Sequence, residues 1–468
     1  MKKILKIMSL IMTVVLLTLT LGSCSAIKFA IMTDPAKAIY LYEQMQFTAG
    51  AAYSANIVTD MTIDQTLGKD VRKNEYRFEV SFSDMGEETM KYIERNYETI
   101  NGISQLQGVF GFSDGKVFIS RDDNNMLSTI NAEGFIDFMG ETSSDDTYFD
   151  MSILNCGKSS YIEDDGIYRV SLSEFYGEAE PCLVNVAANM LGINKGLLKF
   201  KAYSIEAELD EDYYPISETE VLEVEANFGS EGIMSLKLTM KTNYSDIDEP
   251  ITVDIPNLTS YRTISDLPSV MIASQKYNDF FMEASGSFRM SSKYLSKDGT
   301  TQTRSSVEYG VDYTDDDNGF KYTVDTRLAS SMTAVNYVVT YVDGVKRVDY
   351  DKAEYEDTYD NVAESVAQYA FVYSYLDMLR FDVSWILDVT VTENADGGRS
   401  VKMNADVSNS YIISLFVDEE LANKITVESY TYTFNYDADG NLLSCVAKGE
   451  SSFLSAEYDV ETTFTFNT

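Results

Sequence analysis

Apolar and polar residues alternate with a period of two along several segments of the chain. Tyr76, Phe78, Val80 and Phe82 alternate with charged or polar residues, and three later segments repeat the pattern. Their apolar members are Tyr203, Ile205, Ala207 and Leu209, then Leu222, Val224, Ala226 and Phe228, then Leu236, Leu238 and Met240. Such alternation predicts antiparallel strands with one apolar and one solvated face.

Turn and helix signals divide these predicted strands. Asp114-Gly115 and the segment 229–232 predict hairpin turns. Pro35 to Phe47 is predicted to be a helix capped by Asp34, and Pro181 to Leu191 a second helix that ends at Gly192. The first half is predicted to close with a strand-like segment before Pro256, whose alternating apolar residues are Ile251, Val253 and Ile255.

The second half of the chain is predicted to repeat this plan. A helix is predicted from Pro268 to about Met282, and a longer amphipathic helix from Asn361 to Leu379. Asp343-Gly344 predicts a turn, and Trp385 is predicted to pack in the core within a strand from Val383 to Val389. The predicted strand faces are Tyr322, Val324 and Leu328, then Tyr430, Tyr432, Phe434 and Tyr436, and at the end Tyr458, Val460, Phe464 and Phe466.

Two offsets relate the halves. Phe228 to Gly232 and Tyr436 to Gly440 match at an offset of 208 residues, and the two Asp-Gly turns match at 229. We therefore expect a tandem duplication with insertions.

The N-terminus has the features of an export signal. Lys2, Lys3 and Lys6 precede an apolar run from Ile7 to Leu21, which is shorter than the roughly 20 residues of a membrane span. The run ends in Leu21-Gly22-Ser23-Cys24, which resembles the lipobox of bacterial lipoproteins. The resemblance implies a signal peptide over residues 1–23, an acylated Cys24 and a tether over residues 24–34. An ordinary cleaved signal peptide with an incidental cysteine is the alternative.

Charge and composition exclude several functions. The net charge of −39 disfavours binding to the phosphates of nucleic acid. The chain contains no histidine, which excludes Ser-His-Asp and Cys-His catalysis and any zinc site built on imidazole. Catalysis by carboxylates remains open, although no pair among the 75 acidic residues stands out. We expect no enzymatic activity and no cofactor.

The remaining candidate chemistry is sparse. After Cys24 there are three cysteines, of which Cys156 and Cys182 lie in the same half and could pair, while Cys445 is expected to be a buried apolar residue. The segments 315–319 and 437–440 resemble calcium loops but lack the later glutamate, so turns are predicted and no metal site.

Several segments resemble the LolA/LppX-like lipoproteins of bacterial envelopes. They are Glu163 to Leu172 with Tyr168 after an acidic turn, the corner Asp212-Tyr213-Tyr214-Pro215 with the strands after it, and Ile251 to Pro256. The resemblance covers residues 36–257 well and 265–468 weakly. It implies strongly curved, incomplete barrels plugged by helices, which carry lipids or other hydrophobic ligands.

The expected fold is therefore α+β, with two similar domains over residues 35–258 and 265–468. Each is expected to be a strongly curved antiparallel sheet, an incomplete barrel, with helices packed on one face. The expected function is a membrane-anchored extracytoplasmic lipoprotein, held to the outer leaflet through Cys24, that binds or carries a hydrophobic ligand. Apolar residues at period two also fit a plain core, so the alternative is a structural or protein-binding module without a cavity. Ligand-binding residues are not identified by the sequence.

Overall fold

The structure is a computed structural model that describes most of the chain after residue 31. The described residues are 32–121, 124–142, 155–191, 193, 195–227, 233–282, 285–298, 301–316, 319–329, 334–342, 345–350, 353–358, 381–408, 425–453 and 456–466. Cys24 and the predicted helix from Asn361 to Leu379 lie outside these residues, as do Phe228 to Gly232 and Asp343-Gly344.

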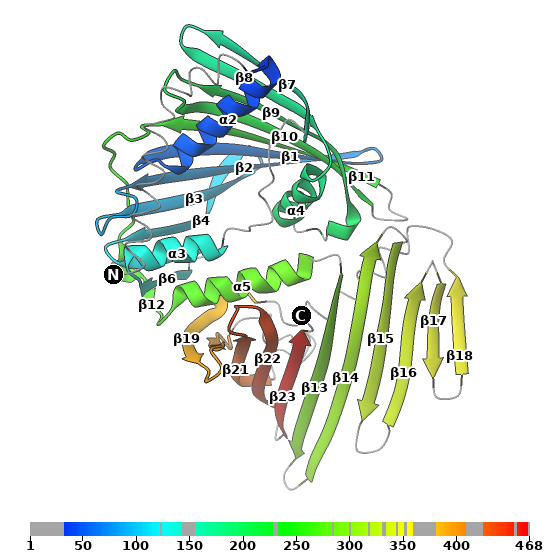
Figure 1. The fold of residues 1–468 in the computed structure, drawn as a ribbon. Coiled ribbons are helices and arrows are strands. Elements are labelled where there is room, and N and C mark those ends of the chain that lie inside the picture. The colour runs from blue at the N-terminus through cyan, green and yellow to red at the C-terminus, as the bar shows by residue number, and fades with distance from the viewer. Residues whose placement is uncertain are drawn as a thin grey trace.

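The first half forms one open sheet with the strand order β12-β6-β5-β4-β3-β2-β1-β11-β10-β9-β8-β7 (Figure 1). All its neighbouring strands are antiparallel except the parallel pair of β12 and β6. The strands are β1 (Ala55–Leu67), β2 (Asp70–Ser83), β3 (Lys91–Ile100), β4 (Ile103–Ser113), β5 (Lys116–Arg121), β6 (Asn124–Thr129), β7 (Cys156–Asp164), β8 (Ile167–Phe175), β9 (Leu198–Leu209), β10 (Pro215–Asn227), β11 (Ile233–Ser245) and β12 (Arg262–Thr263).

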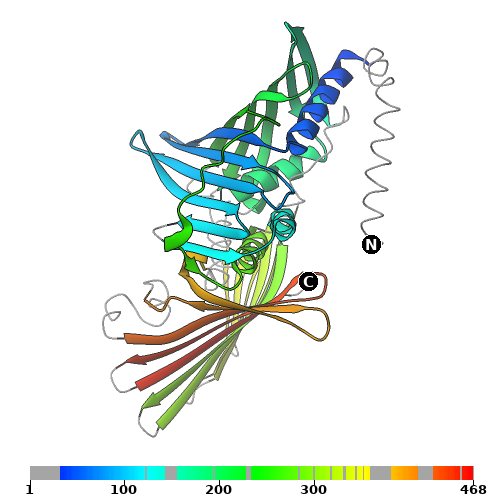
Figure 2. The ribbon, with the colours of Figure 1, turned by 90° about the vertical axis from the view of Figure 1, so that its left-hand side faces the viewer.

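The second half forms a fully antiparallel open sheet with the order β18-β17-β16-β15-β14-β13-β23-β22-β21-β20-β19. Its strands are β13 (Ser285–Asp298), β14 (Thr301–Asp316), β15 (Gly319–Ala329), β16 (Ala334–Val342), β17 (Val345–Tyr350), β18 (Ala353–Thr358), β19 (Ile386–Glu393), β20 (Arg399–Ala405), β21 (Ile425–Tyr436), β22 (Leu442–Phe453) and β23 (Ala456–Phe466). Neither sheet closes on itself, so the expected antiparallel sheets are present as open, twisted layers (Figure 2).

Apart from β12, the two sheets have the same strand order, since β1 to β11 occupy the places of β13 to β23. The equivalent turns agree in detail. Asp210 N donates to Tyr214 O at 3.0 Å, and Asp437 N donates to Asn441 O at 3.0 Å. In each turn the aspartate Oδ1 accepts hydrogen bonds from the backbone two and four residues later.

This equivalence corrects one of the two expected offsets. The turn after β21 corresponds to the turn after β9, from Asp210 to Asp437, which is an offset of 227 residues. The offset of 208 is wrong because it matched that turn with the one after β10. Repeated polar turns on a meander look alike in sequence, and only the strand order separates them. The offset of 229 between the Asp-Gly turns agrees with the strand order.

Among the described residues, four helices accompany the sheets: α2 (Asp34–Gly50), α3 (Ala132–Thr142), α4 (Ala179–Leu191) and α5 (Leu267–Met282). Helix α2 packs on β7, β8 and β10, and α4 packs on β9 and β10. Helices α3 and α5 pack on each other between the two sheets (Figure 1). The helices near Pro35, Pro181 and Pro268 are thus confirmed, and each end lies within three residues of the expected one.

The apolar residues form two cores. One contains α2, α4 and the β1 and β7–β11 part of the first sheet. The other joins the β3–β6 part of the first sheet to α3, α5 and the second sheet. Phe135 of α3 lies within it and stacks on Phe112 of β4 with ring centroids 4.7 Å apart. The first sheet is therefore shared between two cores.

The segment between the halves binds to both of them. Ile264 N donates to Leu127 O at 2.9 Å beside the β12–β6 pair. The guanidinium of Arg262 donates to the carbonyl of Ile386 at 2.7 Å, at the start of β19. The connection is thus hydrogen-bonded to the first and the second sheet.

Three local expectations were wrong. Asp34 is the first residue of α2, and Thr33 occupies the cap position without a side-chain hydrogen bond. The segment 250–257 contains no strand, so Ile251, Val253 and Ile255 follow an irregular path. Trp385 lies in a short 3-10 turn, Val383–Trp385, before β19, although it packs against the core as expected. Asp382 favours this turn because its side chain accepts a hydrogen bond from Ser384 N.

Among the helices that the structure describes, none combines the length and apolar character required to cross a membrane.

Candidate functional site

A pocket of about 850 Å³ lies in the first half, between α2, α4 and the sheet. This volume falls in the usual range for small-molecule sites. The apolar part of its wall comes from helices and strands alike, and Phe47 of α2, which is 66% exposed, lies where the pocket reaches solvent. The apolar residues of the wall are Phe47, Ile57, Leu183, Val186, Leu222 and Met240.

Two glutamates on β10 give the pocket a polar end. Glu218 and Glu220 have the same parity as Leu222, so all three side chains share the face of the sheet that α2 and α4 cover. Glu218 is only 4% exposed. A carboxyl group so deeply buried requires hydrogen-bond partners.

Tyrosine hydroxyls supply these partners. Tyr42 of α2 donates to Glu218 Oε1, and Tyr244 of β11 donates to Glu218 Oε2 at 3.3 Å. Gln46 Nε2 donates to the hydroxyl of Tyr42 at 3.0 Å, which fixes this phenol on the helix. Tyr203 of β9 donates to Glu220 Oε2. The two carboxyl groups are thus held by phenols from three elements.

The protonation of this cluster is shifted from ordinary values. Burial, together with the neighbouring Glu220, raises the pKa of Glu218 to about 7, and the hydrogen bonds from Tyr42, Tyr244 and Gln46 act in the opposite direction. Burial also raises the pKa of Glu220, against the hydrogen bond from Tyr203. Burial and the nearby glutamates raise the pKa of all three tyrosines, so their hydroxyls remain protonated donors.

The second sheet has different residues at the equivalent places. Glu218 pairs with Ala207 on β9 and with Thr242 on β11.

At the same place on β22, Cys445 pairs with Phe434 on β21 and with Phe464 on β23. All three of these residues are fully buried. Phe434 packs against Phe381 and Tyr277, with ring centroids 5.4 and 6.5 Å apart. Aromatic rings therefore fill in the second half a place that small and polar residues line in the first.

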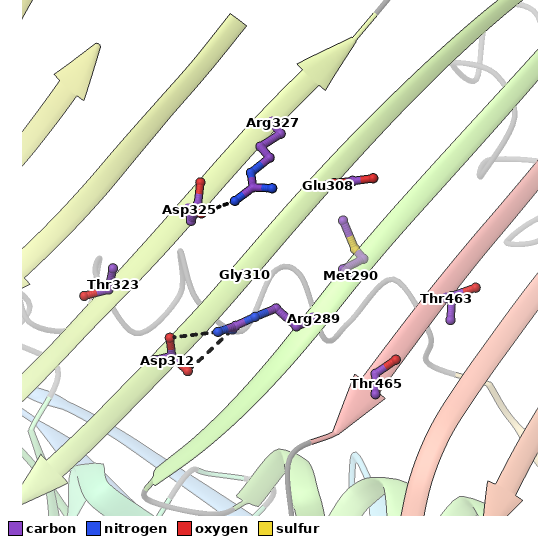
Figure 3. Close-up of a pocket in the computed structure, with 10 residues that line it drawn as sticks. All are labelled: Arg289, Met290, Glu308, Gly310, Asp312, Thr323, Asp325, Arg327, Thr463 and Thr465. Atoms are coloured by element: carbon purple, nitrogen blue, oxygen red, sulfur yellow. Dashed lines mark hydrogen bonds and ion pairs between the residues drawn. The ribbon is translucent and has the colours of Figure 1, made fainter. Parts of the chain in front are cut away.

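A smaller hollow of about 310 Å³ lies on the solvated face of the second sheet, over β13, β14, β15 and β23 (Figure 3). Gly310 has no side chain there, and Arg289 lies across it to reach Asp312, with an N–O distance of 3.4 Å. Arg327 pairs with Asp325 at 3.3 Å. Because both of its arginines already pair with aspartates and its volume is less than half that of the pocket beside α2, this hollow is a weaker candidate.

The cysteines follow the sequence interpretation in part. Cys445 is buried as expected. Among the cysteines that the structure describes, none forms a disulfide, so Cys156 and Cys182 are not joined. The thiol of Cys156 instead donates hydrogen bonds to the carbonyl groups of Lys158 at 3.0 Å and Ser173 at 3.4 Å. Within the described part of the chain no cluster of metal-ligating residues is found.

No family model and no curated protein matches the sequence. The solved structures similar to this chain include the lipoprotein LppX of Mycobacterium tuberculosis, with 12% identity and a TM-score of 0.25 over 47% of this chain and 100% of LppX. The MucA/MucB complex of Pseudomonas aeruginosa has 12% identity and a TM-score of 0.22 over 66% of this chain and 94% of that one. A DUF1329 family protein of Desulfovibrio piger has 9% identity and a TM-score of 0.16 over 47% of this chain and 96% of that one. Scores this low assign neither a family nor a function.

Glu218 and Glu220 were not predicted from the sequence. The predicted strand face that begins at Leu222 was not extended back by the period of two to these residues. Acidic residues in phase with Leu222 and Val224 were the available signal. They indicate a charged group on a face that is otherwise apolar.

Proposed function

We propose that this protein binds or carries a hydrophobic ligand in the pocket between α2, α4 and the first sheet. The observation that carries the proposal is the pocket itself, about 850 Å³ with both an apolar wall and a polar end. If this region were an ordinary hydrophobic core, large side chains would fill it, as Phe434 and Phe464 fill the equivalent region of the second half. In this proposal the protein binds the ligand without changing it chemically.

A substitution that closes the pocket tests this function. Thr242 lines the pocket and occupies the place that Phe464 has in the second sheet. Thr242→Phe is expected to fill the pocket and to lower ligand affinity at least about tenfold, because the apolar tail loses its site. Phenylalanine is favourable in strands, so the fold is retained.

The measurement is mass spectrometry of organic extracts from gently purified protein, together with titration of a decyl amphiphile by calorimetry. Thr239→Phe, on the opposite face of β11, is the matched control and should leave binding unchanged. Equal retention of ligand by wild type and Thr242→Phe would refute the assignment of this pocket.

The N-terminus supports an anchored location outside the cytoplasm. In this proposal Cys24 carries the lipid that holds the protein to the outer leaflet of the membrane, and two acyl chains give stable attachment. Cells grown with labelled palmitate are expected to label wild-type protein, whereas Cys24→Ser should abolish the label. The variant Cys445→Ser is the control and should remain labelled, and an unlabelled wild-type protein would contradict lipidation.

The same proposal accounts for the two similar sheets. The chain is a tandem pair of LolA/LppX-like units over residues 35–258 and 265–468, joined through α5 and the segment before it. The first unit retains the ligand pocket, and the second has become a filled scaffold. The partners are then the membrane, through the lipid, and a hydrophobic ligand, with nucleic acid excluded by the charge of −39.

A further inference from the structure

The charge of the pocket wall is entirely negative. Its described lining residues include Glu43, Glu218 and Glu220, and none of them is a lysine or an arginine. Carboxylates in a largely apolar wall repel anionic groups and attract cations. A ligand with a free carboxylate or phosphate would therefore place like charges together at the polar end.

The glutamates on the solvated face of β10 have cationic partners, unlike those on its inner face. On the solvated face of β10, Glu223 pairs with Lys237 at 3.0 Å, and Glu225 pairs with Lys201. On the inner face, neither Glu218 nor Glu220 has a cationic partner among the described residues, and their partners are phenols and an amide. On the solvated face of β10, where water already stabilises the charge, the glutamates pair with lysines. On the inner face, where burial of a charge is costly, Glu218 and Glu220 have no cation beside them among the described residues.

The geometry supplies both parts of an amphiphile site. The two inner carboxyl groups lie two residues apart on one strand and are fixed by Tyr42, Tyr244 and Tyr203. The apolar wall of Leu183, Val186 and Met240 is continuous with them in the same pocket. A carboxyl group that already accepts one or two phenol hydrogens retains lone pairs for further donors.

We propose that the pocket takes a cationic amphiphile, an alkyl chain carrying an amine, with the ammonium group against Glu218 and Glu220 and the chain along Leu183, Val186 and Met240. This inference rests on the proposed function, because it names the ligand class of the same pocket. An ammonium group donates up to three hydrogen bonds and neutralises the buried charge, whereas an alcohol supplies one donor and no charge.

The test compares three probes with the same decyl chain: decylamine, decanol and decanoate. Each is titrated by calorimetry into the chain from Ser25 onward, which contains every residue that the structure describes. At about pH 8 the amine is protonated and decanoate is ionised, as their model groups are. Decylamine is expected to bind about tenfold more tightly than decanol, and decanoate the most weakly, which is the usual scale of a charge-assisted hydrogen bond.

Variants of glutamates on β10 test whether Glu218 and Glu220 cause the preference for decylamine. The double variant Glu218→Gln with Glu220→Gln is expected to reduce the preference for decylamine over decanol to about twofold or less, because the charge is removed while the shape is retained. Glu223→Gln makes the same chemical change on the opposite face of β10 and should leave the preference unchanged.

The outcomes separate the two proposals. Equal binding of the three probes by wild type, or tighter binding of decanoate, overturns the cationic ligand and leaves a hydrophobic-ligand site in place. An amine preference that survives in the double variant also overturns it, because the ammonium group then lies elsewhere. Failure of all three probes to bind overturns the ligand-binding function itself.

Discussion

Phe434→Ala is expected to lower the free energy of unfolding by about 3–5 kcal/mol, as measured by chemical denaturation. The ring is fully buried and packs between Phe381 and Tyr277. Its removal leaves a cavity that the neighbouring strands cannot close, because Phe434 is held in register between Val401 of β20 and Cys445 of β22.

Thr433→Ala on the adjacent position of β21, whose side chain points to the other face, is the control and should cost less than about 1 kcal/mol. A loss of less than about 1 kcal/mol for Phe434→Ala would contradict the dense packing of the second half. It would also remove the contrast between a filled half and an open one.

Glu218→Gln is expected to stabilise the protein without ligand at about pH 8, by up to roughly 3 kcal/mol. Folding raises the pKa of this carboxyl group from its ordinary value of 4.5 to about 7. The folded state therefore holds the proton more tightly than the unfolded state does. The stability contributed by the protonated group is fully present below pH 4.5 and is lost as the pH rises through 7. Glutamine keeps the neutral form at every pH.

The measurement is the free energy of unfolding of wild type and variant at about pH 5 and about pH 8. The gain should fall below about 1 kcal/mol at the lower pH, where wild-type Glu218 is protonated in the folded state. Glu223→Gln, which loses only an exposed ion pair with Lys237, should change stability by about 1 kcal/mol or less at both values. A gain for Glu218→Gln that does not depend on pH would contradict ionisation of this carboxyl group near neutrality.

The antiparallel sheets and the three helices that begin near a proline could be predicted from sequence. Period-two alternation in β9, β10 and β11 reports directly on a sheet with one solvated face. The apolar residues expected on the inner face are buried in the described part of these strands, from Tyr203 to Leu209, from Leu222 to Ala226, and at Leu236 and Leu238. The segment 250–257 shows why alternation alone does not establish a strand. Its apolar and polar residues alternate as in a strand, but the segment lies outside both sheets. The alternation therefore reflects the alternating burial of residues in an irregular segment.

The candidate site could be predicted only in outline. The sequence indicated an apolar face that helices could cover, and it left open whether a cavity remains. That question depends on which residues meet across strands, such as Ala207, Glu218 and Thr242 in one half against Phe434, Cys445 and Phe464 in the other. The volume is decided jointly by residues 11 to 35 positions apart along the chain, so no local sequence pattern predicts it.

The position of α5 has a consequence for movement of the whole molecule. This helix belongs by its place in the strand order to the second sheet, yet it packs on β5, β6 and α3 of the first half. Rotation of one sheet relative to the other would expose the buried side chains of Leu267, Val270 and Ala273 to water. The two sheets therefore move together as one rigid body, and the mouth of the pocket keeps a constant orientation relative to the far end of the molecule.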